Sequence, residues 1–343
     1  MNPNETFSLR VNHVRRHSSD VVIISFEPDP RLQYKPGQFL TFVFREQDGE
    51  HRRSYSFCSI PETDTLPAIA VKRIQNGRFS RRLFDVRPGD MLQAIRATGQ
   101  FLLPEPTSER KQIFLFGAGI GITPLFSMIK HTVICRPDLE LILVYSNTSP
   151  ENTLFLEELR MLQDKHPHQL FITFLFSNDK NLIRARLNKQ RLGELIQDHY
   201  QAMLQTPMFY TCGPFAYMRM VIFGIEEMGF DNSSIRRELF DTGLPIVKIQ
   251  PPDTGKHRVT LLLKDGERHF DAGYPLTILQ AAKASGIPLP YSCETGKCGS
   301  CTMTCVSGSV WMSYNEVLTA NDQTEGKFLS CTAFPVHNDV TIR

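Results

Sequence analysis

The spacing of four cysteines constrains this chain more than any other feature of its sequence. Cys293 and Cys298 have four residues between them, Cys301 follows after two more, and Cys331 comes after a long gap. This is the ligand spacing of a plant-type [2Fe–2S] cluster, in which thiolates from a tight loop and from a remote segment enclose two irons. Small residues in the loop, such as Gly299, let backbone N–H groups approach the sulfurs and stabilise the electron-rich cluster.

Other uses of clustered cysteines fit this pattern less well. Structural zinc prefers two paired CxxC elements, and here only Cys298 and Cys301 form one. A redox-active CxxC pair would leave Cys293 and Cys331 unexplained. A disulfide framework suits a short secreted chain, whereas these 343 residues begin without a basic and then apolar signal segment. We interpret Cys305 as a small core residue rather than a ligand.

Composition narrows the function class. The chain is 41% hydrophobic and 22% charged, with a formal net charge of +2, so nothing in it strongly attracts nucleic acid or a membrane surface. Its apolar stretches are too short, or too often interrupted by glycine and proline, to cross a bilayer. We therefore expect a cytoplasmic protein that neither binds nucleic acid nor inserts into a membrane.

Hydrophobic periodicity divides the chain into three blocks and a linker. Residues 1–106 show short strands with turn signals, typical of a small antiparallel β-barrel. Residues 107–242 alternate apolar runs with helical stretches, which predicts an α/β domain whose parallel sheet is covered on both faces. Proline-rich residues 243–256 predict a linker, and residues 257–343 open with a hairpin signal.

The same patterns predict individual elements. The expected strands are 21–26, 39–44, 68–73, 113–116, 139–145, 170–176, 208–211, 259–263 and 269–270. The expected helices are 77–85, 124–134, 152–165, 189–200, 215–228 and 277–285. The length of the chain suits two or three domains of this kind.

Two motifs in the first block contain the residue types that a flavin site needs. In Arg53–Ser56, placed between two strands, a guanidinium can fork onto phosphate, an aromatic ring can pack on isoalloxazine, and a hydroxyl can reach a ring nitrogen. Gly77–Ser80 opens a helical segment, and a helix N-terminus with glycine and serine binds anions readily. Taken alone, these motifs also fit an exposed arginine beside a core tyrosine, and a simple helix cap at Ser80.

A glycine-rich loop, Gly117–Pro124, joins a predicted strand to a predicted helix. Glycines there let the backbone approach a pyrophosphate, next to the N-terminus of the helix. The Rossmann fingerprint nevertheless fails, because Ile122 replaces its last glycine and Glu140 precedes the next strand instead of ending it. Cys212, at the end of a later predicted strand, is by itself a small buried residue.

Together, these segments resemble the ferredoxin–NADP reductase superfamily, with residues 259–343 similar to a plant-type ferredoxin domain of β-grasp fold. The resemblance spans nearly the whole chain, in the order found in phenylacetyl-CoA epoxygenase reductases and related reductases. It implies a multidomain protein: an FAD-binding β-barrel, an NAD(P)-binding α/β domain and a [2Fe–2S] domain. Electrons are then expected to pass from NADPH or NADH through FAD and the cluster to a protein acceptor, namely an oxygenase, hydroxylase or desaturase component.

The resemblance also implies roles for individual residues. Arg53 and Ser80 would hold the flavin pyrophosphate, Tyr55 and Ser56 would contact the ring, and the segment with Glu238 would return toward the flavin. FAD is favoured over FMN because the phosphate loop lacks an extra glycine. The implied catalytic residues are Ser56, Cys212 and Glu238. The implied cofactor-binding residues are Arg53, Ser54, Tyr55, Ser56, Val71, Lys72, Gly77, Phe79, Ser80, Gly119, Gly121, Thr123, Pro124, Cys212, Gly213, Pro214 and Phe240. The implied metal ligands are Cys293, Cys298, Cys301 and Cys331.

Some questions stay open at the level of sequence. Arg236 stands where relatives often have histidine, and the choice between NADH and NADPH is unsettled at Ser146–Thr148, although Lys180, Arg184 and Arg186 offer positive charge. A redox-sensing or assembly protein without steady turnover is an alternative, as is a flavin reductase that releases free reduced flavin, which would not need the third block. The acceptor, the oligomeric state and the placement of the ferredoxin domain are also open.

Overall fold

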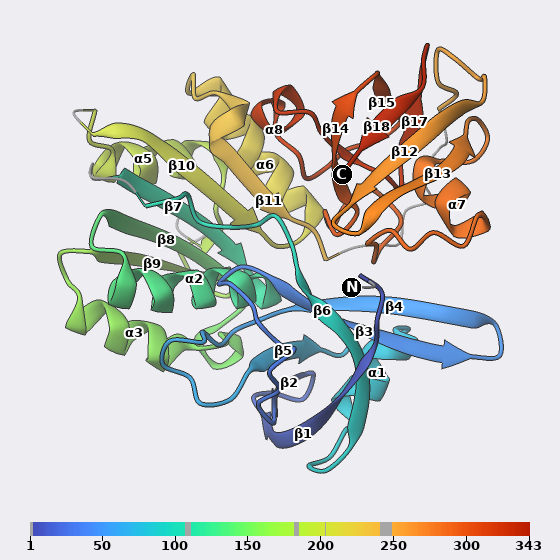
Figure 1. The fold of residues 1–343 in the computed structure, drawn as a ribbon. Coiled ribbons are helices and arrows are strands. Elements are labelled where there is room, and N and C mark those ends of the chain that lie inside the picture. Colours follow the sequence, from blue (N-terminus) through green and yellow to red (C-terminus); the bar gives the residue numbers. More distant parts are fainter. Residues whose placement is uncertain (1–2, 107–110, 182–184, 203, 241–248) are drawn as a thin grey trace.

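The computed structural model describes residues 3–106, 111–181, 185–202, 204–240 and 249–343, and Figure 1 shows three domains built around three main sheets. This confirms the expected fold class of an antiparallel barrel, a parallel α/β domain and a smaller α+β domain at the end of the chain. The domain boundaries at 106, 242 and 256 stay predictions, and residues 107–110 and 241–248 lie outside the described part of the chain.

The first domain is a six-stranded sheet with the order β4-β3-β6-β1-β2-β5, and all its pairs are antiparallel. A bridge between Phe57 and Ile69 brings the two edge strands together, so the sheet curls into a barrel. The short helix α1 (Arg78–Phe84) buries Leu83 in the barrel core. The strands are β1 (Phe7–Arg16), β2 (Val21–Phe26), β3 (Phe39–Glu46), β4 (Gly49–Ser56), β5 (Ala68–Lys72) and β6 (Met91–Thr98).

The second domain is a parallel five-stranded sheet with the order β11-β10-β7-β8-β9, covered by helices on both faces. Leu125 and Leu159, from α2 and α3, pack on one face, and Leu192 and Val221, from α5 and α6, pack on the other. The strands are β7 (Lys111–Ala118), β8 (Leu139–Asn147), β9 (Leu170–Phe176), β10 (Gln205–Cys212) and β11 (Ile235–Glu238). The helices are α2 (Ile122–Cys135), α3 (Leu156–Lys165), α5 (Lys189–His199) and α6 (Phe215–Glu227), with 3-10 turns η1 (Gly119–Gly121), η2 (Pro150–Asn152) and η3 (Asn232–Ser234).

The third domain has a five-stranded sheet with the order β13-β12-β18-β14-β16 and a small pair, β15-β17. Thr277 caps α7 through a capping box with Gln280, which satisfies two N–H groups at the start of that helix. The elements are β12 (His257–Leu263), β13 (Gly266–Ala272), α7 (Ile278–Ala284), β14 (Thr302–Ser307), β15 (Val310–Met312), α8 (Ala320–Thr324), β16 (Lys327–Leu329), β17 (Ala333–Pro335) and β18 (Val340–Ile342). Three of the candidate ligands, Cys293, Cys298 and Cys301, lie in the irregular loop between α7 and β14.

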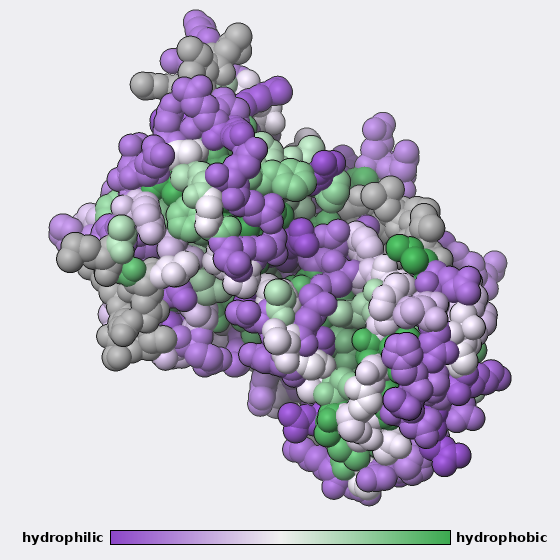
Figure 2. Space-filling model, turned by 90° about the horizontal axis from the view of Figure 1, so that it is seen from above, coloured by the Kyte–Doolittle hydropathy of each residue, from purple (hydrophilic) through white to green (hydrophobic). Residues whose placement is uncertain are grey.

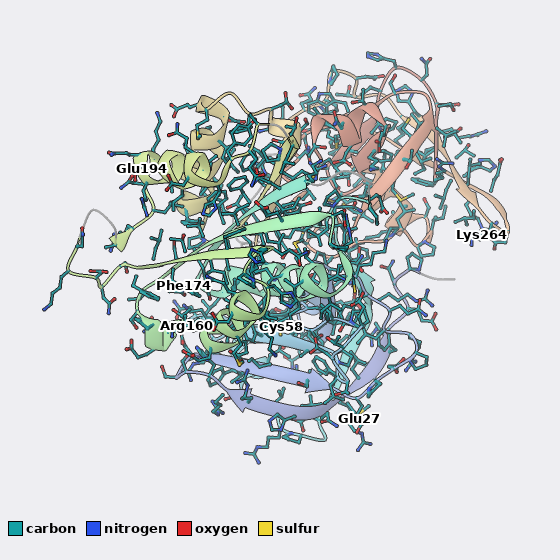
Figure 3. All side chains as sticks on the ribbon, turned by 90° about the vertical axis from the view of Figure 1, so that its left-hand side faces the viewer. Glu27, Cys58, Arg160, Phe174, Glu194 and Lys264 are labelled. Atoms are coloured by element: carbon teal, nitrogen blue, oxygen red, sulfur yellow. The ribbon has the colours of Figure 1, made fainter. Side chains whose placement is uncertain are left out.

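The barrel and the nucleotide domain share one hydrophobic core. Ile23, Cys58 and Ala70 from the barrel are buried in the same cluster as Leu125 and Leu141 of the parallel sheet and its helix. Figure 3 shows Cys58 inside the molecule, where these two domains meet. The third domain has a core of its own. Among the described residues, no helix is long and apolar enough to span a bilayer.

Two expectations about local structure were wrong. The segment Arg53–Ser56 does not separate two strands, because it forms the end of β4. The helix expected from residue 152 begins instead at Leu156, after the turn η2. Phe155 precedes it with a φ of 61°, a left-handed conformation that is uncommon for a bulky residue. Its ring stacks on Phe126 with 4.1 Å between the ring centroids, so burial of the ring compensates for the cost of this backbone conformation.

Candidate functional site

The four candidate ligand cysteines gather at one end of the ferredoxin domain, and the structure shows them as two pairs. The Sγ atoms of Cys301 and Cys331 are 3.1 Å apart. Cys293 and Cys298 interact with each other, and their hydrogen bond lowers the pKa of the Cys293 thiol, with Thr295 adding to the effect. The same hydrogen bond raises the pKa of the Cys298 thiol well above its ordinary value, and the contact with Cys301 does the same for Cys331.

This pairing suits a two-iron centre better than a single zinc ion. A tetrahedral zinc site brings its sulfur ligands close to one another, because each Zn–S bond is about 2.3 Å long. In the described part of the chain, only Glu62, His131 and Cys135 have three potential ligand atoms that all lie within 4.8 Å of one another. The four cysteines therefore do not form one compact tetrahedron, whereas two irons with two thiolates each fit the two pairs.

The loop around the cysteines depends on glycines with positive φ. Gly296 and Gly299 have φ values of 71° and 76°, and a Cβ atom on Gly299 would come within 3.0 Å of side chains from Gln100 and Val317. The N–H of Ser300 lies 3.5 Å from the Sγ of Cys298, so backbone donors do approach the sulfurs.

Cys305 does not join the four ligand cysteines. Its thiol instead faces the carbonyl groups of Ser307 and Gly308, at 3.4 and 3.8 Å. The residue is half-buried on β14 and packs against the ferredoxin core, where its side chain is one small apolar group among others.

A pocket open to solvent lies where the cysteine loop meets the barrel and the nucleotide domain. It encloses about 480 Å³, including space open to solvent. Its lining includes Phe39, Arg53, Ser54, Ser56, Glu238, Phe240, Cys293 and Cys298. Residues from all three domains, and from two of the expected cofactor sites, thus border the same space. The surface seen from above is mostly hydrophilic, with scattered apolar areas between the polar groups (Figure 2).

The three candidate catalytic residues lie together beside this pocket. The hydroxyl of Ser56 donates to Oε2 of Glu238 at 2.6 Å, and Cys212 on β10 is the register partner of Glu238 on β11. Burial raises the pKa of Glu238 to about 8, while the Ser56 hydrogen bond acts in the opposite direction. Burial, and then the nearby Glu238, raises the pKa of the Cys212 thiol well above its ordinary value, so that thiol stays protonated.

Arg53 and Tyr55 of the flavin motif lie next to aromatic rings of the barrel. The guanidinium of Arg53 lies 4.8 Å from the ring centroid of Phe79, next to the start of α1. Tyr55 is half-buried, with its ring centroid 6.0 Å from that of Phe42. Burial raises the pKa of Tyr55 to about 12. A guanidinium close to a helix start can donate to a dinucleotide pyrophosphate, and an aromatic ring can pack on the flavin ring.

Ser80 and the residues of β5 make contacts within the barrel. The N-cap of α1 is Gly77, and the buried Ser80 hydroxyl accepts from the N–H of Ile74 at 3.1 Å and donates to the carbonyl of Gly77 at 3.2 Å. Ser80 thus holds the turn together from inside. Val71 is buried in the barrel core, and the exposed Lys72 forms an ion pair with Asp20 at 3.6 Å, so neither side chain joins the pocket residues.

The glycine-rich loop and the end of β10 contact each other closely. A Cβ atom on Gly121 would lie 2.2 Å from the carbonyl oxygen of Cys212, and one on Gly213 would lie 2.9 Å from the Cβ of Ala118. Gly119 has a φ of 55° and open space around it. Gly121 therefore permits packing inside the domain, whereas Gly119 leaves room for a ligand to approach the backbone.

Further along the loop, Thr123 and Pro124 are buried in the first turn of α2. The hydroxyl of Thr123 donates to the carbonyl of Ile120 at 3.1 Å. No side chain caps the first N–H groups of α2, as expected for a helix start that receives an anion. Pro214 stands at the N-cap of α6, next to the same loop.

The segment expected to discriminate NADH from NADPH lies at the carboxyl end of β8. Ser146 and Asn147 belong to that strand, two residues beyond its expected end, and the carbonyl groups of Asn147 and Thr148 accept from the N–H groups of residues 177 and 178. Glu140 is buried at the opposite end of β8, where it accepts from Gln112 at 2.8 Å, so it is remote from a ribose site at the strand end. Lys180 and Arg186 are exposed, and Arg184 lies outside the described residues.

Sequence reasoning missed the residues that join the barrel to the cysteine loop. These residues are Arg52, Thr41 and Ser292, and all three are buried. Thr41 forms a hydrogen bond with Ser292, and Arg52 donates to the carbonyl of Tyr291 in the same segment. A signal was present in the pair Arg52–Arg53, because neighbouring residues on a strand point to opposite faces. Both arginines border the pocket, but the guanidinium of Arg52 bonds to the segment before the cysteines, whereas that of Arg53 lies over the ring of Phe79.

Comparison with known proteins agrees with this geometry. Family models match residues 8–102 as an oxidoreductase FAD-binding domain, 115–222 as an oxidoreductase NAD-binding domain and 262–336 as a 2Fe-2S iron-sulfur cluster binding domain. The chain is 31% identical to the ferredoxin reductase component of 3-ketosteroid-9-alpha-monooxygenase from Rhodococcus rhodochrous, over 97% of this chain and 95% of the relative. It is also 31% identical to one component of the 1,2-phenylacetyl-CoA epoxidase of Escherichia coli, over 98% and 96%. The solved structure of phthalate dioxygenase reductase has the same fold, with a TM-score of 0.59, 22% identity and coverage of 100% of this chain and 99% of that one.

Proposed function

This chain belongs to the family of the ferredoxin reductase components of oxygenases, and from that premise we propose that it delivers electrons from NAD(P)H to a partner oxygenase. FAD, NAD(P)H and a [2Fe–2S] cluster are the cofactors of this electron-transfer oxidoreductase. The observation that supports the proposal best is the shared pocket, because the flavin-motif residues and two candidate cluster ligands border it together.

We assign each group of residues one task in this reaction. When bound, FAD accepts two electrons as a hydride and gives them up singly to the cluster. Arg53 and the start of α1 would hold the pyrophosphate, and Gly119 would let the nicotinamide nucleotide reach the backbone of the loop. The hydrogen-bonded pair Ser56 and Glu238 can hold a proton at the flavin edge, since the carboxyl group is neutral below a pKa of about 8.

The acceptor is the finer part of the proposal. Both relatives described above serve oxygen-activating enzymes, according to their names. A plant-type cluster has a potential near about −400 mV, which is low enough to reduce most oxygen-activating metal centres. We propose an oxygenase, hydroxylase or desaturase component as the acceptor, and the cytoplasm as the location, where thiols stay reduced.

Purification without oxygen and assay with NAD(P)H test this function. The protein should be reddish-brown, contain two irons per chain and catalyse steady NAD(P)H-dependent reduction of cytochrome c. In Cys298→Ser the visible absorption of the cluster should vanish, while NAD(P)H should still reduce the flavin. Cys305→Ser is the matched control and should keep the cluster. A colourless preparation that binds only zinc would refute the proposal, and a cluster without turnover would favour a redox sensor.

A further inference from the structure

A buried arginine joins the barrel to the segment just before the first candidate ligand. The side chain of Arg52, on β4, is 5% exposed. Its guanidinium donates to the carbonyl of Tyr291 at 2.7 Å, to Oδ1 of Asn4 at 2.9 Å and to Oε1 of Glu50 at 2.9 Å. It also lies 3.6 Å from the ring centroid of Tyr291. Four contacts on one buried side chain make this a specific junction, not a chance surface contact.

Three hydroxyl groups make a second contact between the same two segments. The Oγ atoms of Ser54 and Ser292 are 2.9 Å apart, and Oγ1 of Thr41 lies 2.8 Å from the first and 3.3 Å from the second. Ser292 immediately precedes Cys293. A hydrogen bond therefore connects a residue of the flavin motif to the neighbour of a candidate cluster ligand.

The alternation of side chains along β4 explains how one strand can serve two cofactors. Residues two apart on a strand share a face. Arg52 and Ser54 contact the cysteine loop, and Ser56 reaches Glu238 at the pocket. Arg53 and Tyr55, in between, contact the rings of Phe79 and Phe42 on the barrel side. The face of β4 with Arg52, Ser54 and Ser56 thus meets the cysteine loop and the pocket side by side.

We propose that Arg52 and the Ser54–Ser292 hydroxyl pair are positioning residues that fix the cluster loop against the flavin strand. This inference rests on the proposed function, because its purpose is to set the distance between flavin and cluster, on which the rate of electron transfer depends. Arginine is needed because its planar fork can donate in several directions at once. Lysine keeps the charge and has three N–H donors, but all three are on a single nitrogen, so it cannot span the positions of Glu50, Asn4 and Tyr291 as the guanidinium fork does.

Arg52→Lys in the complete holoprotein tests the proposal. Flavin reduction by NAD(P)H should keep its rate, since the residues assigned to the flavin and the nucleotide are unchanged. The following reduction of the cluster, observed by stopped-flow absorption, should slow about tenfold or more, because small misplacements of reacting groups are costly. Small-angle scattering should show a larger radius of gyration, as the ferredoxin domain leaves its docked position. That second measurement does not depend on turnover.

Arg136→Lys is the matched control. The Arg136 side chain is similarly buried, at 8% exposure, and it donates to Asp138 and to the carbonyl of Pro104, away from the ferredoxin domain. This variant should keep both rates and the radius of gyration. Ser292→Ala is a milder second variant, for use if Arg52→Lys does not fold, and it should slow cluster reduction in the same direction.

The outcomes separate this inference from the proposed function. If folded Arg52→Lys, or Ser292→Ala in its place, reduces its cluster at the native rate and keeps the native radius of gyration, the positioning role is refuted. If Arg136→Lys shows the same losses, the effect is general destabilisation and the inference is again refuted. If the native protein does not reduce its cluster with NAD(P)H, the proposed function fails, while the scattering comparison still tests the junction.

Discussion

At the end of β11, Glu238 carries a carboxyl group that burial holds in an unusual charge state. Its pKa rises to about 8 from an ordinary 4.5, because the fold removes the group from water. Between these two values the folded chain binds the proton and the unfolded chain releases it. Stability should therefore fall as the pH rises from about 4.5 through about 8. The hydrogen bond from Ser56 offsets part of this loss.

Glu238→Gln should remove this pH dependence. An amide keeps the shape and can still accept from Ser56, but it cannot ionise. Without flavin, the variant should be more stable than the parent at about pH 9, on the order of 5 kcal/mol, with little difference near pH 5. Thermal unfolding followed by circular dichroism at several pH values measures this. Glu267→Gln, at an exposed position, is the control, and equal slopes for Glu238→Gln and the parent would contradict the burial argument.

Among the secondary-structure elements, the loop between β7 and α2 shows how two glycines in one motif can have different tasks. Gly121 lies against the carbonyl of Cys212, whereas Gly119 has a positive φ and free space beside it. The sequence pattern treats both as places where backbone approaches a phosphate. The structure instead separates an internal packing position, Gly121, from a position with free space beside it, Gly119.

Alanine substitutions should separate these tasks. Gly121→Ala should destabilise the nucleotide domain severely, because its Cβ would clash with the backbone of β10. Gly119→Ala should cost only about 1–3 kcal/mol for the strained φ, but it should raise the KM for NAD(P)H. Gly193→Ala, in the open middle of α5, is the control and should stabilise by up to about 1 kcal/mol. Melting temperatures and KM values decide, and equal effects at positions 119 and 121 would contradict the assignment.

How well an element could be predicted from sequence depended on what stabilises it. The β8 strand was predicted as 139–145 and observed as Leu139–Asn147, because a continuous apolar run reports burial on both faces. The β4 strand was missed, because its buried residues are Arg52 and Ser56 and their partners are polar groups from distant segments. The β1 strand was also missed, since its apolar alternation stops after Val11.

The same distinction holds for the candidate site. Three of the four cysteine positions lie in one loop, so their spacing could be read directly from the sequence. The contact between Ser56 and Glu238 joins residues 182 positions apart. It exists because β11 lies at the edge of the parallel sheet beside β10, and a strand order of this kind leaves no local pattern. The resemblance supplied both residues, but not their hydrogen bond.

For the whole molecule, the division of the hydrophobic cores indicates two units of folding from three domains. The barrel and the nucleotide domain share a core, whereas the ferredoxin domain has its own. Polar contacts, such as the 2.8 Å hydrogen bond from Arg237 to the carbonyl of Glu316, join the ferredoxin domain to the rest of the described chain. Shared apolar burial couples the stabilities of two domains more strongly than a few polar contacts do.

A pair of core substitutions should reveal these units. Ile23→Ala, in the core shared by the first two domains, should cost about 2–5 kcal/mol and lower the temperature at which FAD is released. It should leave the temperature of cluster bleaching unchanged. Ile278→Ala, in the ferredoxin core, should do the reverse. Flavin fluorescence and visible absorption during one heating scan measure both events, and a common shift of both by either substitution would show a single cooperative unit.

The shared core also has an evolutionary consequence. A recombination event between β11 and β12 divides no hydrophobic core, because the clusters before it and the ferredoxin core after it are each complete, so both fragments can persist in new proteins. An event between the barrel and β7 would instead expose Ile23, Cys58 and their partners to water. Gene fusions can therefore add, lose or relocate the iron–sulfur module, while the flavin and nucleotide modules are inherited together.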